Sequence, residues 1–261
     1  MSQIEFDENV ARALERMYMT PDVVGQRSDF LRAVALREGE RALDVGVGPG
    51  LLVHDMAKIV GEKGRVAGVD ASDAMVGISE KRCADLGWTD FHQADATALP
   101  FDDASFDVVT SSQVYEYVAD MEGALTEVHR VLRPGGRVFI LDTDWDSVVW
   151  RTRDRARMRR VMDAWDGHLH DPHLPARLGA LLEGAGLQVT HREVIPIVNP
   201  SLHPHCYSFG ILAAIQGFVA ASGEVEADEA QAWADELRAL GESGEYFFSI
   251  NRYVFGALRA G

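Results

Sequence analysis

The feature that most constrains this chain is the segment Leu43–Gly50, which reads Leu-Asp-Val-Gly-Val-Gly-Pro-Gly. A short apolar run, Arg41 to Val45, leads into three closely spaced glycines, and an apolar helical pattern follows over about 51–60. Glycine adopts positive φ without strain and lets a ligand approach the backbone closely. A strand that enters a helix through such a turn is typical of nucleotide-type sites in open α/β sheets, although a tight turn without a ligand could carry the same glycines.

The alternation of strand and helix continues along the chain. Further strands are predicted at 65–70, 89–94, 106–111, 137–143, 187–198 and 246–258. Helices are predicted at 7–20, 22–36, 51–60, 72–86, 121–132, 151–166, 174–185, 205–222 and 226–240. Nearly continuous apolar strands separated by helices predict an α/β fold, Rossmann-like, with a mostly parallel sheet and helices on both faces.

Composition narrows the classes of partner. The chain has 261 residues and a formal net charge of −16, which argues against nucleic acid or an anionic membrane as the main partner, because phosphate binding needs clustered cations. Its two cysteines, Cys83 and Cys206, are too few for a disulfide framework or a four-thiolate metal site. The acidic N-terminus does not resemble a signal peptide, and no apolar run approaches the roughly 18–20 residues of a membrane span, so a cytoplasmic location is expected.

Three aspartates lie at or near the carboxyl ends of the first three predicted strands. Asp44 precedes the first glycine, Asp70 ends the second strand, and Asp95 follows the third. A carboxylate beside the turn repels phosphate and suits a cationic amino-acid ligand, whereas an acid at position 70 can bind ribose hydroxyls. Taken singly, each acid could instead be a helix cap or turn residue. An NAD-dependent oxidoreductase shares the acid at position 70, but the glycine spacing and Asp44 argue against it.

Four stretches together resemble class I S-adenosylmethionine (SAM)-dependent methyltransferases. They are DVGVGPG at 44–50, GVD at 68–70, QADATALPFDDASFDVV at 93–109 and EVHRVLRPGGRVFILD at 127–142. More narrowly, they resemble the group that includes ubiquinone/menaquinone-type and small-molecule methyltransferases. The resemblance covers about 36–145, is specific for SAM binding and says little about the methyl acceptor. It implies a seven-stranded sheet whose last strand is antiparallel.

The resemblance also implies which residues hold SAM and its product S-adenosylhomocysteine (SAH). The residues expected around the methionine part and the sulfonium are Asp44, Gly46, Gly48, Gly50, Ser112 and Gln113. The residues expected around the ribose and the adenine are Asp70, Ala71, Met75, Asp95 and Ala96.

The chain is expected to form a single methyltransferase domain over 1–261. Residues 1–36 would form a helical lid, 37–145 the SAM-binding core, and 146–261 the acceptor half, with a helical insertion at about 200–243. In the lid, Arg27 could pair with the SAM carboxylate and Tyr18 could cover it. An ordinary surface arginine and a core tyrosine are the alternative.

Histidines gather in two segments that should overhang the pocket. His168, His170 and His173 form one group, and His203 and His205 the other. They could be polar loop residues, a general base for the acceptor, or metal ligands. The spacing is not a specific zinc pattern, so no metal is expected, and His170 or His173 is the expected base.

The acceptor is expected to be a small, partly apolar molecule that receives a methyl group on O, N or C. Candidate contacts are Tyr117, Asp144, Trp145, His203 and Tyr207, and core packing is the alternative for Tyr117 and Trp145. Six arginines lie between 151 and 160 and favour a solvated helix face, with an anion site or a dimer contact as alternatives.

A homodimer is one possible assembly. A SAM-binding protein without methyltransferase activity would carry the same SAM residues, and arsenite methylation is disfavoured because it relies on several cysteines.

Overall fold

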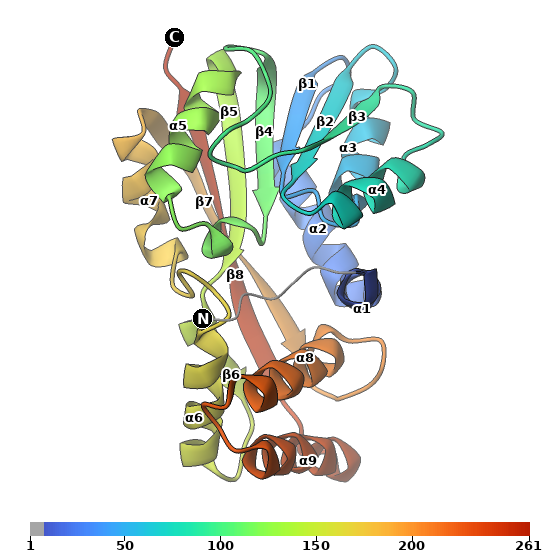
Figure 1. Ribbon diagram of the computed structural model, residues 1–261, viewed down its shortest axis with the longest axis vertical. Helices are drawn as coiled ribbons and strands as arrows, with labels where there is room; N and C mark the ends of the chain where they lie inside the picture. Colours follow the sequence, from blue (N-terminus) through green and yellow to red (C-terminus); the bar gives the residue numbers. More distant parts are fainter. Residues whose placement is uncertain (1–7) are drawn as a thin grey trace.

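The computed structural model describes residues 8–261, which form helices around one mixed, eight-stranded sheet (Figure 1). The strands are β1 (Arg41–Val45), β2 (Arg65–Asp70), β3 (Thr89–Gln93), β4 (Phe106–Ser112), β5 (Leu132–Thr143), β6 (Val149–Trp150), β7 (Leu187–Asn199) and β8 (Phe248–Arg259). Their order is β3-β2-β1-β4-β5-β8, and β8 pairs in addition with β6 and β7. The first five strands are parallel, and β8 is antiparallel to each neighbour, which confirms the predicted Rossmann-like sheet.

The helices of the described chain are α1 (Glu8–Tyr18), α2 (Pro21–Val34), α3 (Leu51–Val60), α4 (Asp73–Arg82), α5 (Met121–Val131), α6 (Arg155–Asp166), α7 (Pro175–Gly184), α8 (Tyr207–Ser222) and α9 (Ala227–Ser243). α5 and α7 bury their apolar residues on one face of the sheet. α2 and α3 cover the other face, and Figure 1 shows α4 beside them. Helices therefore cover both faces of the sheet, as is usual for a parallel sheet.

Among the boundaries that differ from the sequence prediction are the starts of β5 and α6. β5 begins at Leu132 rather than at Arg137. Leu132 pairs with Phe106 of β4 and Arg137 pairs with Val108, so residues 133–136, which were expected to form a turn, lie at a register shift within the strand. α6 begins at Arg155 rather than at 151, because the side chain of Asp154 caps it. The preceding residues form the short strand β6, which the sequence did not predict.

A third core lies beyond the carboxyl ends of β4 and β5. Here α6, α8 and α9 pack together with the first residues of β8, and Figure 1 shows this lobe below the sheet. α1 lies between the lobe and the sheet, in the region predicted to be the lid, whose first seven residues are outside the described chain. Within residues 8–261, no helix combines the length and the apolarity needed to cross a bilayer.

Candidate active site

The glycine turn joins β1 to α3 and exposes backbone at its centre. The amides of Gly46 and Val47 both donate to the Val69 carbonyl, at 2.8 and 2.9 Å, which anchors the turn to β2. Gly46 has φ +77°, and a Cβ there would lie 2.1 Å from Cγ2 of Val114. Gly48 has φ +52°, but a Cβ there would meet no atom within 4 Å. Packing therefore requires Gly46, whereas Gly48 leaves the backbone open to a ligand.

Gly50 serves the packing of helices. A Cβ on Gly50 would lie 2.9 Å from Cα of Ser79, so the glycine allows α4 to approach the start of α3. The Ser79 hydroxyl donates to the Gly48 carbonyl at 2.8 Å and fixes the turn from the same side. Gly50 is buried and is not among the residues that line the pocket, in contrast to the expectation that it contacts SAM.

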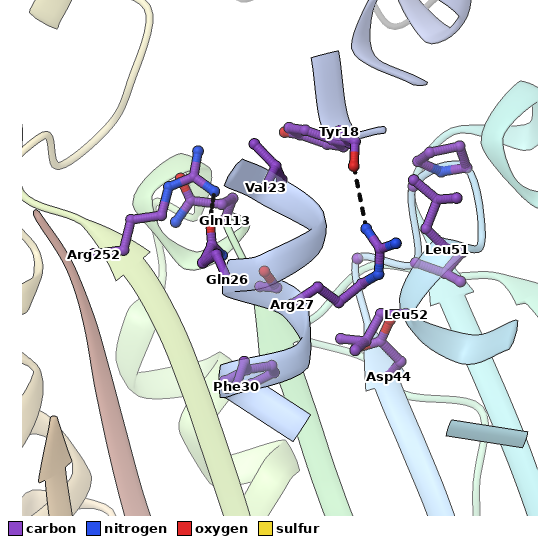
Figure 2. Close-up of a pocket in the computed structure, with 15 residues that line it drawn as sticks. Tyr18, Val23, Gln26, Arg27, Phe30, Asp44, Leu51, Leu52, Gln113 and Arg252 are labelled. Carbon is purple, nitrogen blue, oxygen red and sulfur yellow. Dashed lines mark hydrogen bonds between the residues drawn. The ribbon is translucent and has the colours of Figure 1, made fainter. Parts of the chain in front are cut away.

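A pocket opens in front of the turn, with α2 across it (Figure 2). Of the residues expected to bind the cofactor, seven line it: Tyr18, Arg27, Asp44, Gly46, Gly48, Ser112 and Gln113. The remaining lining residues are Val23, Gln26, Phe30, Val47, Pro49, Leu51, Leu52 and Arg252. The lid, the glycine turn and the end of β4 thus meet around one space.

The residues expected around the ribose and adenine lie beside the pocket and do not line it. Asp70 accepts hydrogen bonds from the amides of Gly48 and Ser72, both at 2.9 Å, so its carboxyl group is held against the turn. Asp95 is exposed and accepts from the Thr97 amide and hydroxyl, which lower its pKa. The carbonyl of Asp70 accepts from the Ala94 amide at 3.0 Å, which brings the two strand ends together.

The three uncharged residues expected around the ribose and adenine differ in exposure. Ala71 is exposed, Ala96 packs partly against the sheet core, and Met75 is only 2% exposed. The amide of Met75 donates to Ser72, which caps α4. Ala71 is therefore accessible, whereas Met75 would need to move to present its side chain to a ligand.

Asp44 is a buried acid that faces the pocket. It is 3% exposed, and its Oδ1 accepts from the Thr110 hydroxyl at 2.8 Å. Burial raises the pKa of Asp44 to about 8; the Thr110 hydrogen bond opposes this shift, and the charge of Asp70 adds to it. The group is therefore mostly protonated at neutral pH, and a cationic ligand would favour its ionised form.

Arg27 joins the lid to α3 by a hydrogen bond. Its Nε donates to Asp55 of α3 at 2.8 Å, and its Nη1 donates to the Tyr18 carbonyl at 3.2 Å, as Figure 2 shows for the second bond. Arg27 was expected to pair with the SAM carboxylate. In the structure it lines the pocket while Asp55 occupies one edge of its guanidinium.

Sequence reasoning missed a buried polar cluster at the far side of the pocket. Arg252 of β8 is 2% exposed, donates to the Gln26 side chain, and lies 4.8 Å from the centre of the Tyr207 ring. Glu116 is 2% exposed and Asp142 is fully buried. A charged residue, Arg252, inside the predicted strand 246–258 was the signal that could have revealed it.

Burial raises the pKa of Glu116 to about 8, although the nearby charge of Arg252 opposes the shift. Burial and the charge of Glu116 raise the pKa of Asp142 well above its usual range. Oε2 of Glu116 and Oδ2 of Asp142 have no hydrogen-bond partner in the described chain. Burial therefore favours the neutral form of both groups.

Gln113, directly after β4, has a strained backbone. Its φ is +59°, which is rare for a residue other than glycine and costs on the order of 1–3 kcal/mol. Its amide donates to the Leu141 carbonyl at 2.8 Å, and its Oε1 accepts from the Thr143 hydroxyl at 2.5 Å. These bonds fix the side chain where β4 and β5 end in the pocket wall.

The histidines expected near the acceptor do not line the pocket. His168 is a core residue: it is 3% exposed, stacks on Trp165 with ring centres 3.6 Å apart, and burial lowers its pKa to about 4. His170 and His203 are exposed, and the His170 amide donates to the Glu116 carbonyl at 2.9 Å. His170 therefore points out from a loop that its backbone attaches to the cluster.

His173 lies in an acidic setting. Its Nδ1 is 3.2 Å from Asp144 Oδ1 and 3.6 Å from Asp146 Oδ2, and Asp166 lies on its other side. Burial would lower the pKa of His173, but these carboxylates raise it. Ligand atoms of His173, Asp144 and Asp146 lie within 4.8 Å of one another and could hold a cation. This group lies outside the pocket lining.

The aromatic candidates belong to the core of the helical lobe. Trp145 is 7% exposed and packs edge-on against Trp165 at 5.4 Å. Tyr117 is partly buried against the same core, and Tyr207 contacts Arg252. Of these three, Tyr207 touches a residue of the pocket wall.

The arginines between 151 and 160 largely form ion pairs on the surface. Arg153 pairs with Glu245 at 2.9 Å, Arg160 pairs with Glu229, and Arg157 approaches Glu236 at 3.7 Å. These contacts join α6 to α9 and its following loop. They match the solvated helix face that the sequence favoured.

Comparison with known proteins places this geometry in a family. A methyltransferase domain model matches residues 43–140. An uncharacterized protein in a transposon of Streptomyces fradiae is 33% identical over 247 residues, which cover 92% of this chain and 69% of that protein. The UbiE C-methyltransferase of Vibrio vulnificus is 39% identical over 136 residues, which cover 51% of this chain. The match spans 50% of that enzyme.

Solved structures show the same fold. A crystal structure of a Bacillus halodurans protein described as a putative methyltransferase superposes with a TM-score of 0.65 at 17% identity, covering 91% of this chain and all of that one. A phosphoethanolamine N-methyltransferase of Haemonchus contortus gives a TM-score of 0.64 at 18% identity over 98% of this chain and 58% of its own. The glycine turn, the strand order and these relatives agree: the chain belongs to the class I SAM-dependent methyltransferases, in the UbiE-like group.

Proposed function

We propose that this protein transfers the methyl group of SAM to a small molecule bound between the sheet and the helical lobe. The observation that carries the proposal is the meeting of the open backbone at Gly48 and the buried Asp44 at one end of one pocket, with the Asp70 carboxyl group beside it, bonded to the Gly48 amide. Named methyltransferases among the relatives support the activity, and they align with this chain over about half of their own length.

The residues present fit SAM. A Cβ at position 48 would occupy open space, so glycine leaves room where a ligand can contact the backbone. Asp44 can accept a hydrogen bond from a cationic amino group, and Asp70 lies where a carboxylate could bind ribose hydroxyls. SAM supplies a methyl group on a positively charged sulfur.

What the chain itself contributes is positioning and exclusion of water. α2 covers the pocket, and Val23 and Phe30, both at most 4% exposed, make that cover apolar. Arg27 and Asp55 fasten the cover to α3. Holding the reactants in line inside a closed, apolar space is the main catalytic requirement of such a displacement.

The Asp70→Asn variant tests the cofactor site. Calorimetry should show SAH binding to the wild-type protein and an affinity about 10- to 100-fold lower in the variant, because a charged hydrogen-bond acceptor is lost. Asp73→Asn, an exposed acid in the first turn of α4, is the matched control and should bind SAH normally. Equal affinity in both variants would contradict the assignment of Asp70.

Transfer of labelled methyl from SAM to a metabolite would then separate an enzyme from a protein that only binds SAM. Binding of SAH without transfer to any fraction of a metabolite extract would favour the second.

A further inference from the structure

Two arginines line the pocket, on opposite sides. Figure 2 shows Arg27 beside Leu51 and the glycine turn, and Arg252 beside Gln113, with α2 between them. SAM carries one carboxylate, in the amino-acid part expected near the turn. Arg27 lies on that side, so the cofactor gives no reason for a second cation at position 252.

Arg252 has no anionic partner within the part of the chain that the structure describes. Its hydrogen bond goes to the neutral amide of Gln26, and its guanidinium lies over the Tyr207 ring. Its Nε is buried without a hydrogen-bond partner. An arginine side chain stays charged in proteins, so the positive charge remains although the side chain is only 2% exposed.

The acidic groups near Arg252 do not balance this charge. They are Glu116, Asp142, Tyr18 and Tyr207, and burial raises the pKa of each. Burial therefore favours the neutral form of all four groups. No ion pair joins Arg252 to Glu116 or Asp142 in the described part of the chain, although the charge of Arg252 opposes the rise in the pKa of both carboxyl groups.

A buried cation without a counter-ion is unfavourable, and buried charges in proteins are therefore normally paired. We propose that Arg252 binds an anionic group of the methyl acceptor, so that the acceptor is an organic acid with a carboxylate, or another group that is ionised at neutral pH. The Gln26 amide holds one edge of the guanidinium and Tyr207 supports its face, whereas Nε has no hydrogen-bond partner.

This inference rests on the proposed function, and its test separates the two. A bacterial metabolite extract is divided on an anion-exchange column at pH 7.5, and each fraction is incubated with the protein and labelled SAM. The retained, anionic fractions should accept methyl groups, and the unretained fraction should not. In Arg252→Gln the KM for the active fraction should rise about 50-fold, and Arg252→Lys should recover part of the loss.

SAH binding by calorimetry and thermal unfolding accompany each variant. Arg252→Gln should bind SAH within about twofold of the wild type, since Arg252 is assigned to the acceptor. Arg192→Gln is the matched control: its guanidinium also lies over an aromatic ring, Phe255, but on the exposed side of β7. Its KM should not change.

Methyl transfer to an unretained fraction would overturn the inference and leave the proposed function intact. Loss of SAH binding in Arg252→Gln would also overturn it, because the arginine would then serve the cofactor. If the wild type binds SAH but methylates nothing, the proposed function fails, and the inference fails with it.

Discussion

At the scale of single residues, the pocket is marked by acids that burial keeps neutral. Asp44 is the clearest case, because it lies in the wall next to the glycine turn and its hydrogen-bond partner is a neutral hydroxyl. A raised pKa means that the folded protein binds a proton at pH values where the unfolded chain has lost it. The ionised form becomes favourable only when a positive group arrives.

The affinity for SAH should therefore depend on pH. Its amino group is a cation that favours ionised Asp44, and the pKa of Asp44 is about 8 without ligand. Between pH 6 and 8, protonation of Asp44 competes with binding, so the affinity should rise by up to about tenfold per unit and level off above pH 8. Calorimetric titrations measure this directly.

Asp44→Asn is the control for that titration, because it keeps an oxygen for Thr110 but cannot ionise. Its SAH affinity should be low and nearly flat between pH 6 and 8. A wild-type affinity that is constant or falls over the same interval would contradict the assignment.

The residue scale also shows the limit of sequence reasoning. Asp44, Gly46 and Gly48 could be predicted because strand, glycine and acid follow one another within a few positions. Arg252 and Gln26 are distant in sequence and meet only because β8 lies beside α2. A lone polar residue in an apolar element carries no sign of its partner.

At the scale of elements, one carboxylate joins the cover of the pocket to the helical lobe. Asp22, in the first turn of α2, accepts from the Tyr207 amide at 2.8 Å and from the Asn199 side chain at 2.7 Å. It thereby links the starts of α2 and α8 to the end of β7. Burial opposes ionisation, but these bonds and those from Thr20 and Val23 outweigh it and lower the pKa of Asp22.

Asp22→Ala should lower the free energy of unfolding by about 1–3 kcal/mol at pH 7, because the buried Tyr207 amide and Asn199 lose a charged acceptor. A lowered folded-state pKa gives stability that is present above the unfolded pKa and lost as pH falls through the folded one. The effect should therefore shrink towards pH 3. Urea unfolding at both pH values measures it.

Asp29→Ala serves as the comparison, since Asp29 lies on the same helix and pairs only with the exposed Arg32. It should change stability by less than about 0.5 kcal/mol. An Asp22→Ala effect of equal size at pH 7 and pH 3 would show that the ionised carboxylate does not act as described.

The elements themselves were predictable where local signals were strong. Apolar runs fixed β1, β2 and β4, and the Ser72 cap fixed the start of α4. The bulged start of β5 and the short strand β6 were not predictable, because both depend on pairing with strands that lie elsewhere in the sequence.

At the scale of the whole molecule, three hydrophobic cores pack around one sheet. The cores on the two faces of the sheet hold the glycine turn, and a separate core within α6, α8 and α9 holds the lobe. Gly46 and Gly48 and the inner side of α2 line the pocket, whereas α9 contributes no residue to its lining. Ligand binding should therefore stabilise one part of the molecule more than the other.

Hydrogen exchange should reveal this difference. SAH should slow exchange of amides at 46–50, in α2 and at 112–113, because those segments surround the ligand, whereas amides of α9 should exchange at the same rate with and without SAH. Asp70→Asn at the same SAH concentration is the control. Uniform protection across α9 would instead indicate that the molecule responds as a single unit.

The pairing of β7 with β8 has a further consequence. β7 pairs with β8 from Leu187 to Asn199, and β5 pairs only with the part of β8 beyond Asn251, so the ribbon continues out of the sheet into the lobe. Phe248 and Ile250 anchor the lobe, and Arg252 follows on the same strand. The spacing between the two ends of the pocket is thus set by strand geometry, without a hinge. Evolution could replace α8 and α9 to suit a new acceptor while the cofactor end keeps its dimensions.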